Sequence, residues 1–337
     1  MMTCAGWDIG GAHVKIAFVN QGKLIVEQVE CPLWKGVGEL ISVLKQLMDR
    51  LPRHIVMHHV TMTGELADVF KNRQDGVTKI VTTFSNHLPC EHDVKYFSRD
   101  GLLNSEDAIY NYQAVASANW IASGECLAKF CDSAIFVDIG STTTDVLKIT
   151  NGSLVISNYS DFERLRSGEL VYTGVVRSCV NTIAREVMFK GDAIPLIAEL
   201  FASSADIYRI LGKLPDHADL GNTMDGMPKD RLSSFRRLAR MLGCDYQDSD
   251  ANEWISVANQ IAQHQMDCIK SSIKKMIDED SSGVKIVGAG IGRFLLEDIA
   301  TQLSLPYVDI VSVINAGEIT PVEIAADCAP AISLVIE

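Results

Sequence analysis

Several features that would assign a chain to a familiar class are missing from these 337 residues. No run of about 18 apolar residues occurs, which is the length that a membrane-spanning helix needs. The first residues include neither a basic cluster nor a long apolar core, so we expect no signal peptide. The nine cysteines are scattered, and none forms a Cys-x-x-Cys pair. An odd number of cysteines without a signal peptide indicates a cytoplasmic protein with free thiols.

Positive charge is also scarce, because 30 Lys and Arg residues face 43 Asp and Glu residues, for a net charge of −13. A chain this acidic does not bind the phosphate backbone of nucleic acid non-specifically. We therefore expect small-molecule substrates as partners, with no nucleic acid and no membrane, while a homodimer is compatible with the sequence. The hydrophobic content of 47% is sufficient for a sizeable core in one or two domains.

An acidic residue followed by a glycine turn is the first feature that is present. Residues 137–146 read VDIGSTTTDV and follow a β-branched run that predicts a buried strand. Gly140 permits a sharp turn whose backbone N–H groups and hydroxyls suit phosphate oxygens. The predicted phosphate-binding residues here are Ser141, Thr142, Thr143 and Thr144. Asp138 would hold a divalent cation, Mg²⁺, against the anion, and Asp145 would act similarly at the far end of the turn.

The same device occurs near the N-terminus, where residues 6–16 read GWDIGGAHVKI. Asp8 is the second predicted metal-binding acid, and Lys15 adds a positive charge that can reach phosphates. The predicted phosphate-binding residues of this turn are Gly10, Gly11 and His13. Asp8 and Asp138 are too far apart in the sequence for one local hairpin. Two related lobes that each contribute one hairpin to a shared cleft explain the duplication.

The hydropathy pattern predicts strands and helices in alternation. Strands are expected at 5–9, 14–19, 24–30, 55–63, 77–84, 134–137, 147–150, 154–158 and 284–287. The turn Asn20-Gln21-Gly22 predicts a hairpin between the strands at 14–19 and 24–30. Helices are expected at 37–51, from 65 onward, and at 106–130, 195–211, 229–242, 252–278, 293–303 and 321–336, with a long loop at 213–230 and a turn at 278–283. We therefore expect an α/β protein with an N-terminal lobe, 1–130, that holds the first hairpin. A C-terminal lobe, 131–337, would hold the second hairpin and a late glycine turn, with its last helix packed back on the body.

Two polar segments invite a functional interpretation. Residues 87–93 read HLPCEHD and resemble a metal cluster, but their spacing matches no zinc pattern, so a polar loop is the better interpretation. Residues 161–172 read DFERLRSGELVY and mix charges of both signs. A solvated loop and a substrate loop are both compatible with this composition, and we favour the substrate loop. Its predicted acceptor-binding residues, with one arginine that follows it, are Arg164, Arg166, Glu169 and Arg177.

The paired hairpins resemble the phosphate-1 and phosphate-2 motifs of the actin, sugar kinase and Hsp70 superfamily. Four further stretches resemble one branch of it, the hydantoinase/oxoprolinase-like proteins of tetrahydromethanopterin-linked C1 metabolism. They are residues 61–66 (TMTGEL), 168–175 (GELVYTGV), 201–206 (FASSAD) and 288–290 (GAG). The resemblance implies a two-lobed actin-like (ribonuclease-H-like) α/β fold with mixed sheets flanked by helices. In the superfamily the turn that matches Gly288 and Gly290 contacts adenosine.

The resemblance also implies a transferase, the ether synthase of methanofuran or methylofuran biosynthesis. It would condense 5-(aminomethyl)furan-3-ylmethyl diphosphate with a phenol, either γ-glutamyltyramine or a tyrosine-derived relative, and release diphosphate. Mg²⁺ at Asp8 and Asp138, together with Lys15, would neutralise the leaving group. A general base would assist, because a free phenol titrates near 10. His13, Glu65 and Asp145 are the candidates for this base, and the sequence does not choose among them.

Two other classes of function are compatible with the same motifs. An ATP-dependent small-molecule kinase or ATPase would use the paired hairpins and the late glycine turn, with ATP as its substrate. A non-catalytic nucleotide-sensing module would fit the absence of an obvious catalytic triad. The family-like stretches favour the synthase, and whether ATP binds is left open.

Overall fold

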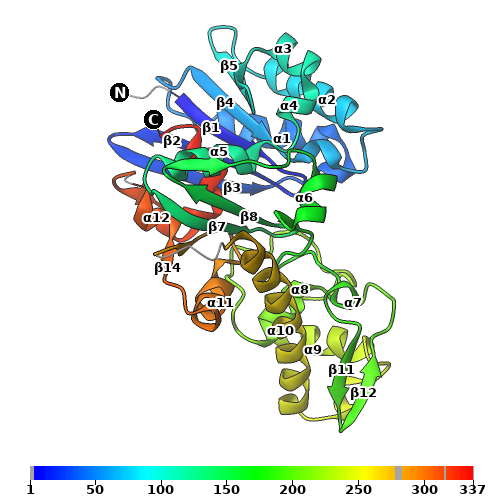
Figure 1. Cartoon of the computed structure of the whole chain (residues 1–337). Helices are drawn as coiled ribbons and strands as arrows, with labels where there is room; N and C mark the ends of the chain where they lie inside the picture. Colours follow the sequence, from blue (N-terminus) through cyan, green and yellow to red (C-terminus); the bar gives the residue numbers. More distant parts are fainter. Residues whose placement is uncertain (1–3, 278–282, 315, 337) are drawn as a thin grey trace. The chain divides into compact units, whose positions relative to one another are not determined.

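The computed structural model describes residues 4–277, 283–314 and 316–336, which form two compact units (Figure 1). Unit 1 consists of Met1–Asp132, Gly152–Leu154 and Ile310–Glu337, and unit 2 of Ser133–Asn151 and Val155–Asp309. The chain thus leaves unit 1 near residue 132 and returns to it at residue 310, whereas the sequence prediction assigned residues 131–337 to one lobe. The predicted meeting of Asp8 and Asp138 in one cleft depends on the placement of the two units and stays a prediction.

Unit 1 is built on a mixed sheet with the strand order β15-β3-β2-β1-β4-β5-β6. Its strands are β1 Cys4–Ile9, β2 His13–Asn20, β3 Lys23–Glu30, β4 Met57–Met62, β5 Asp93–Ser98, β6 Gly101–Leu103 and β15 Ile319–Thr320. The predicted hairpin between β2 and β3 is confirmed, because Gln21 and Gly22 both have positive φ as a type I′ turn requires. The central strand β1 pairs antiparallel with β2 and parallel with β4.

Short helices surround this sheet. They are α1 Val37–Met48, α2 Arg73–Asn86, α3 Ser105–Tyr110, α4 Tyr112–Val115, α5 Asn119–Ala128, α12 Ile310–Val313 and α13 Ala329–Ser333. In Figure 1 the red C-terminal segment runs among the blue N-terminal strands. The close fit of α13 against β1 explains Gly6, since a Cβ there would come within 2.1 Å of the Ala331 carbonyl oxygen. The predicted closing helix is therefore present but short, and two 3₁₀ turns precede it.

The prediction of a strand at 77–84 is wrong, because these residues lie within α2. Val77, Ile80, Val81 and Phe84 are buried, and their spacing of three and four places them on one helical face. The Asn72 side chain caps the helix by accepting a hydrogen bond from the Asp75 N–H. The helix predicted from residue 65 is only the 3₁₀ turn η2 Gly64–Leu66. Burial of one face has overridden the β-propensity of the valines, isoleucine and threonines.

The long helix predicted at 106–130 is also wrong, because the chain forms three separate helices there, α3, α4 and α5. Asn111 leaves helical geometry with ψ near +36° between α3 and α4. Ser117 has a φ of +52° between α4 and α5, a value that interrupts any helix. Two breaks thus divide the predicted helix into three short ones.

A buried histidine on β4 is a distinctive feature of the unit 1 core. The indole N–H of Trp7 donates to His58 Nδ1 at 3.0 Å, and His58 Nε2 lies 2.9 Å from His92 Nδ1. Burial and the neighbouring His92 lower the pKa of His58 to about 3. The polar segment 87–93 is a turn, as predicted, and the residues that the structure describes include no group of three or more His, Cys, Asp or Glu side chains arranged to hold a metal. His58 therefore belongs to the core, and the half-buried His92 lies beside it.

The depressed pKa of His58 makes the stability of the protein depend on pH. The unfolded chain takes up a proton at this histidine below about pH 6.5, whereas the folded chain takes it up only near pH 3. We expect the free energy of unfolding to fall by about 1.4 kcal/mol for each pH unit below 6.5 on account of this group. Urea denaturation between pH 5 and pH 8 measures the slope.

The matched comparison is between His58→Gln and His54→Gln, since His54 is exposed. His58→Gln should flatten the slope below pH 6.5, and His54→Gln should leave it unchanged. Identical slopes in the wild type and in His58→Gln would contradict the assignment.

Unit 2 is built on a second sheet, in which β10-β8-β7-β13-β14 are neighbours. Its strands are β7 Ser133–Ile139, β8 Thr144–Thr150, β10 Leu170–Val171, β13 Lys285–Ala289 and β14 Tyr307–Asp309, while β9 Ser153–Val155 follows β8 and a separate hairpin contains β11 Glu186–Phe189 and β12 Asp192–Pro195. The helices are α6 Asp161–Ser167, α7 Val180–Ile183, α8 Ser204–Ile210, α9 Arg231–Arg240, α10 Ala251–Met276 and α11 Leu296–Leu303. No helix among the described residues of either unit is long and apolar enough to cross a membrane.

Three predictions for residues 154–211 need correction. The helix predicted at 195–211 is only α8, because the chain before it forms the strand β12 and an irregular connection. The segment 161–172 is not a loop, because it contains α6, whose start is fixed by a capping box between Ser160 and Glu163. The strand predicted at 154–158 shortens to β9, and most of the turn predicted at 278–283 lies outside the described residues.

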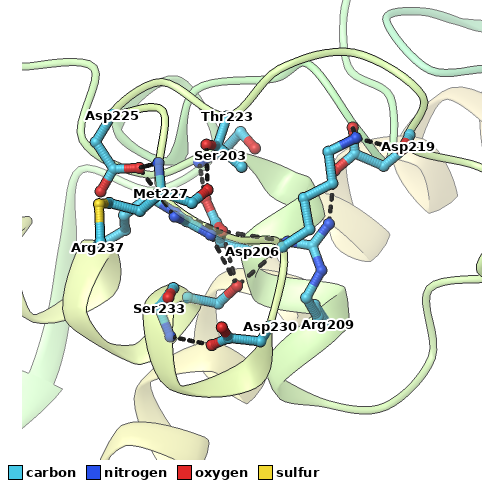
Figure 2. Close-up of polar contacts among 12 residues, drawn as sticks. Ser203, Asp206, Arg209, Asp219, Thr223, Asp225, Met227, Asp230, Ser233 and Arg237 are labelled. Atoms are coloured by element: carbon cyan, nitrogen blue, oxygen red, sulfur yellow. Dashed lines mark hydrogen bonds and ion pairs between the residues drawn. The ribbon is translucent and has the colours of Figure 1, made fainter.

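The long loop predicted at 213–230 is confirmed, and buried ion pairs fix it to α8 and α9 (Figure 2). Figure 2 shows Asp206 between Arg237 and Arg209. Asp206 Oδ1 accepts from Arg237 Nε at 2.8 Å and from Arg209 Nη1 at 3.3 Å. Each arginine also reaches the loop, Arg209 through Asp219 at 2.6 Å and Arg237 through Asp225 at 3.0 Å. Asp206, in the family-like stretch 201–206, thus anchors a loop that has no helix or strand of its own.

Because Arg237 is fully buried, removing its charge leaves the Asp206 carboxylate without a main counter-ion. We expect Arg237→Ala to lower the free energy of unfolding by about 3–5 kcal/mol, the range for breaking a buried ion pair. Arg240→Ala is the control, because Arg240 also pairs with Asp225 but its side chain is half exposed. This control should cost less than about 1 kcal/mol. Equal losses in the two variants, measured by urea denaturation, would show that the network does not hold the loop.

Candidate active site

The turn between β7 and β8 forms the core of the candidate site. Asp138 and Asp145 are register partners on the two strands. The turn is closed by a hydrogen bond of 2.8 Å from the Gly140 N–H to the Thr143 carbonyl. Ser141, Thr142 and Thr143 are partly exposed, so their polar groups can meet a ligand. Thr144 differs, because its buried hydroxyl donates to the Thr173 carbonyl at 2.8 Å.

The segment 173–177 packs directly against this turn. The Val175 N–H donates to the Gly140 carbonyl at 3.1 Å, and the Arg177 N–H donates to the Ser141 carbonyl at 2.9 Å. Gly174 permits this approach, since a Cβ there would lie 2.4 Å from the Thr142 nitrogen. The family-like stretch 168–175 therefore serves as the support of the predicted phosphate turn.

The late glycine turn supports the same site from another direction. Strand β13 runs parallel to β7, with Ala289 opposite Asp138. Gly290 has a φ of +79°, and a Cβ there would come within 2.3 Å of Asp138 Oδ1. Just beyond it, the Gly292 N–H donates to the Ile139 carbonyl at 2.8 Å. The structure thus brings together two motifs, Asp138 and Gly288–Gly290, that are about 150 residues apart in the sequence.

The predicted acceptor-binding residues divide into two kinds. Arg164 is buried and donates from Nη2 to Asp145 Oδ1 at 2.8 Å and to the Glu169 carbonyl at 3.2 Å. Burial raises the pKa of Asp145, while the Arg164 charge opposes that shift. The Glu169 carboxylate is buried too and accepts from Asn158 and Ser167. Only Arg166 and Arg177 have exposed side chains.

The first hairpin, in unit 1, has the same acid–glycine turn between its two strands. The Gly10 N–H donates to the His13 carbonyl at 2.9 Å, and the Gly11 carbonyl accepts from the Leu33 N–H at 3.1 Å. Asp8 is buried beside Lys15, with 3.7 Å between Asp8 Oδ2 and Lys15 Nζ. The hairpin thus places a carboxylate, which suits a cation, beside an ammonium group, which suits a phosphate.

Glu65 lies on η2, next to the first hairpin. Thr63, the residue before η2, donates its N–H to the Ile9 carbonyl at 2.9 Å, so the stretch 61–66 adjoins the end of β1. The Glu65 side chain is only 1% exposed, and its Oε1 accepts a hydrogen bond from Ser117 Oγ at 2.7 Å. This carboxylate is therefore held in the frame of unit 1, beside the turn that contains Gly10.

A cavity of about 250 Å³ lies beside the late glycine turn in unit 2. It is lined by Pro215, Ile291, Arg293, Phe294, Glu297 and Tyr307. None of these residues was singled out from the sequence as a site residue. The sequence offered one indication of this cavity: Ile291 and Arg293 closely follow Gly290, in a glycine turn that precedes a helix. Pro215 and Tyr307 come from distant segments, and no local pattern identifies them.

Comparisons with known proteins agree with this architecture. The sequence profile of the Hydantoinase/oxoprolinase family matches residues 57–319. A relative from Methanocaldococcus jannaschii is 32% identical over 302 residues, which cover 89% of each chain. It is named (4-{4-[2-(gamma-L-glutamylamino)ethyl]phenoxymethyl}furan-2-yl)methanamine synthase. A relative of the same name from Methanococcus vannielii is 34% identical over 173 residues, 51% of this chain and 77% of that one.

Among solved structures, the nucleotide-free acetone carboxylase superposes with a TM-score of 0.54 over 98% of this chain and 69% of that chain. At 13% identity this likeness concerns the fold alone. The predicted actin-like α/β class, with mixed sheets flanked by helices in each unit, is confirmed. Since the family profile covers most of the sequence and the relative from Methanocaldococcus jannaschii matches nearly all of it, the chain belongs to the hydantoinase/oxoprolinase family.

Proposed function

We propose that the protein is a synthase that joins an aminomethylfuran to a phenol through an ether bond and releases diphosphate. The observation that carries this proposal is the 32% identity, over 89% of both chains, to a relative named for such a product. The phenoxymethylfuran in that name contains the ether itself. The reaction would belong to the biosynthesis of a methanofuran- or methylofuran-type cofactor, with γ-glutamyltyramine or a tyrosine-derived phenol as acceptor.

The chemistry needs one bond to form and one to break. The furan ring stabilises positive charge on its attached methylene carbon as the carbon–oxygen bond to diphosphate breaks. The phenol oxygen then forms the new bond to that carbon, and its proton passes to a base. Because a phenol titrates near 10, a base increases the fraction of the reactive phenolate. Stabilising the leaving diphosphate is therefore the main task of the protein.

The hairpin of β7 and β8 is suited to that task. Its turn offers backbone N–H groups and the hydroxyls of Ser141, Thr142 and Thr143 to phosphate oxygens. Asp138 adds one carboxylate beside them. Mg²⁺ commonly binds one or two carboxylates together with substrate phosphates, so this donor set fits it without a cluster of protein ligands. When bound, Mg²⁺ would supply positive charge to the leaving group.

The first hairpin supplies a second set of similar groups. We propose that Asp8 holds a cation, and that Lys15 and the turn of Gly10, Gly11 and His13 bind phosphate oxygens. The base stays open among His13, Glu65 and Asp145. For Asp145 the ion pair with Arg164 favours a positioning role, since Arg164 Nη2 already binds its Oδ1 at 2.8 Å.

For the acceptor, the exposed Arg166 and Arg177 are the better candidates for binding a carboxylate. Arg177 directly follows the segment that packs on the turn, and its backbone N–H contacts Ser141. Arg164 and Glu169 are engaged within unit 2, so we propose that they support the site without binding the acceptor.

An ATP-dependent kinase or ATPase is the second candidate. The observation that favours it is the late glycine turn beside Asp138, because the matching turn contacts adenosine in the superfamily. The two candidates differ in their products. A kinase releases ADP, whereas the synthase releases diphosphate from the furanylmethyl donor and uses no ATP.

The decisive assay incubates the protein and Mg²⁺ with 5-(aminomethyl)furan-3-ylmethyl diphosphate and γ-glutamyltyramine, with and without ATP. We expect one diphosphate for each ether formed and the same rate when ATP is omitted. Mass spectrometry quantifies the ether, and an enzymatic assay quantifies diphosphate and phosphate. ADP formed in proportion to the product, with no product in the absence of ATP, would instead support the kinase.

A further inference from the structure

The cavity beside the late glycine turn is next to the candidate site but is not used in the chemistry described above. Ile291, which lines it, lies between Gly290 and Gly292, the residues that contact Asp138 and Ile139. A group bound in the cavity would therefore lie close to whatever occupies the hairpin of β7 and β8. Its volume of about 250 Å³ is below the roughly 300–1,000 Å³ of sites for drug-sized ligands, so it suits one ring with short substituents.

The walls of the cavity favour a flat ring. Phe294 and Tyr307 contribute aromatic surface, and Ile291 and Pro215 contribute aliphatic surface. The Phe294 ring is itself held edge-to-face against Tyr208, with 5.2 Å between ring centroids. Pro215 belongs to the loop that the Asp206 network fixes. These walls are thus preformed, which reduces the entropic cost of binding.

The charges at the cavity favour a cation. The Arg293 guanidinium donates to Asp309 at 2.9 Å and to the Gly290 carbonyl at 3.0 Å, so a carboxylate already balances its charge. Glu297, one turn further along, adds a second carboxylate, and these three side chains together carry a net negative charge. Burial raises the pKa of Tyr307 to about 12, so this side chain is a neutral hydroxyl at pH 7.

We propose that this cavity binds an aromatic ring that carries a primary ammonium group, with the ring against Phe294 and Tyr307 and the ammonium group at Glu297. This inference rests on the proposed function, since the donor of that reaction is an aminomethylfuran. The neighbouring hairpin would hold the diphosphate of the same molecule. Glu297 is exposed, so a neutral nucleobase would gain no charge–charge attraction from it, and an acceptor carboxylate would be repelled by it.

The test uses two small probes on the full-length protein at pH 7. Furan-2-ylmethylamine carries the ammonium group, and furan-2-ylmethanol is its neutral counterpart. We expect the amine to bind at least about fivefold more tightly than the alcohol, as measured by ligand-observed NMR titration, because a hydrogen bond to a charged partner contributes more than a neutral one.

Glu297→Gln should reduce that preference to about one, and Phe294→Ala should weaken both probes. Glu186→Gln is the matched control, because it removes an exposed carboxylate from β11, which lies at the other end of unit 2 from β7 in Figure 1. This control should retain the preference. A circular dichroism spectrum like that of the wild type confirms that each variant is folded.

Equal affinities for amine and alcohol, or a preference that survives Glu297→Gln, would overturn the inference. Adenosine that competes with the amine and binds more tightly than the amine would also overturn the inference and would indicate a nucleoside site. The probes need no turnover, so binding to Glu297 without any ether formation would refute the proposed function alone. Ether formation with a donor KM unchanged in Glu297→Gln would refute this inference alone.

Discussion

The close packing of two backbone segments against one turn is the constraint on which the candidate site depends. The turn after β7 is contacted by segment 173–177 and by the late glycine turn, and both contacts require glycine. A Cβ at Gly174 or Gly290 would come within about 2.4 Å of the turn or of Asp138. Since such contacts do not occur between real atoms, the position of the Asp138 carboxylate and the shape of the turn are fixed by the absence of side chains at two distant positions.

A second layer of buried charge keeps this arrangement in place. Arg164 ties Asp145, on the far side of the same hairpin, to the segment that follows α6. Asp206 forms ion pairs with the arginines of α8 and α9. These arginines in turn bind the loop that contains Pro215, one of the residues that line the cavity. Buried ion pairs contribute little net stability when they replace good apolar packing, but each partner becomes costly to remove. Their role here is to specify one geometry around the site.

Local sequence patterns predict individual turns, hairpins and loops, but they do not predict which distant segments pack against them. The acid–glycine turns, the β2–β3 hairpin and the long loop are encoded by neighbouring residues, and all were predicted. The strand predicted at 77–84 failed because burial of one helical face outweighed β-propensity. The arginines of 161–177 look equivalent in the sequence, and only tertiary packing separates the buried Arg164 from the exposed Arg166. Likewise, no local signal could join Pro215 and Tyr307 to Ile291 in one cavity.

The central claim is that the turn after β7, shaped by the two glycines, is the diphosphate site. Calorimetric titration of the wild type, Gly290→Ala and Gly38→Ala with diphosphate in the presence of Mg²⁺ tests it most directly. Gly38 is the control, because a Cβ there would have no neighbouring atom within 4 Å. The account predicts at least about tenfold weaker binding for Gly290→Ala, with Gly174→Ala as a second variant should the first not fold, and unchanged binding for Gly38→Ala. A folded Gly290→Ala protein that binds diphosphate as tightly as the wild type would contradict it.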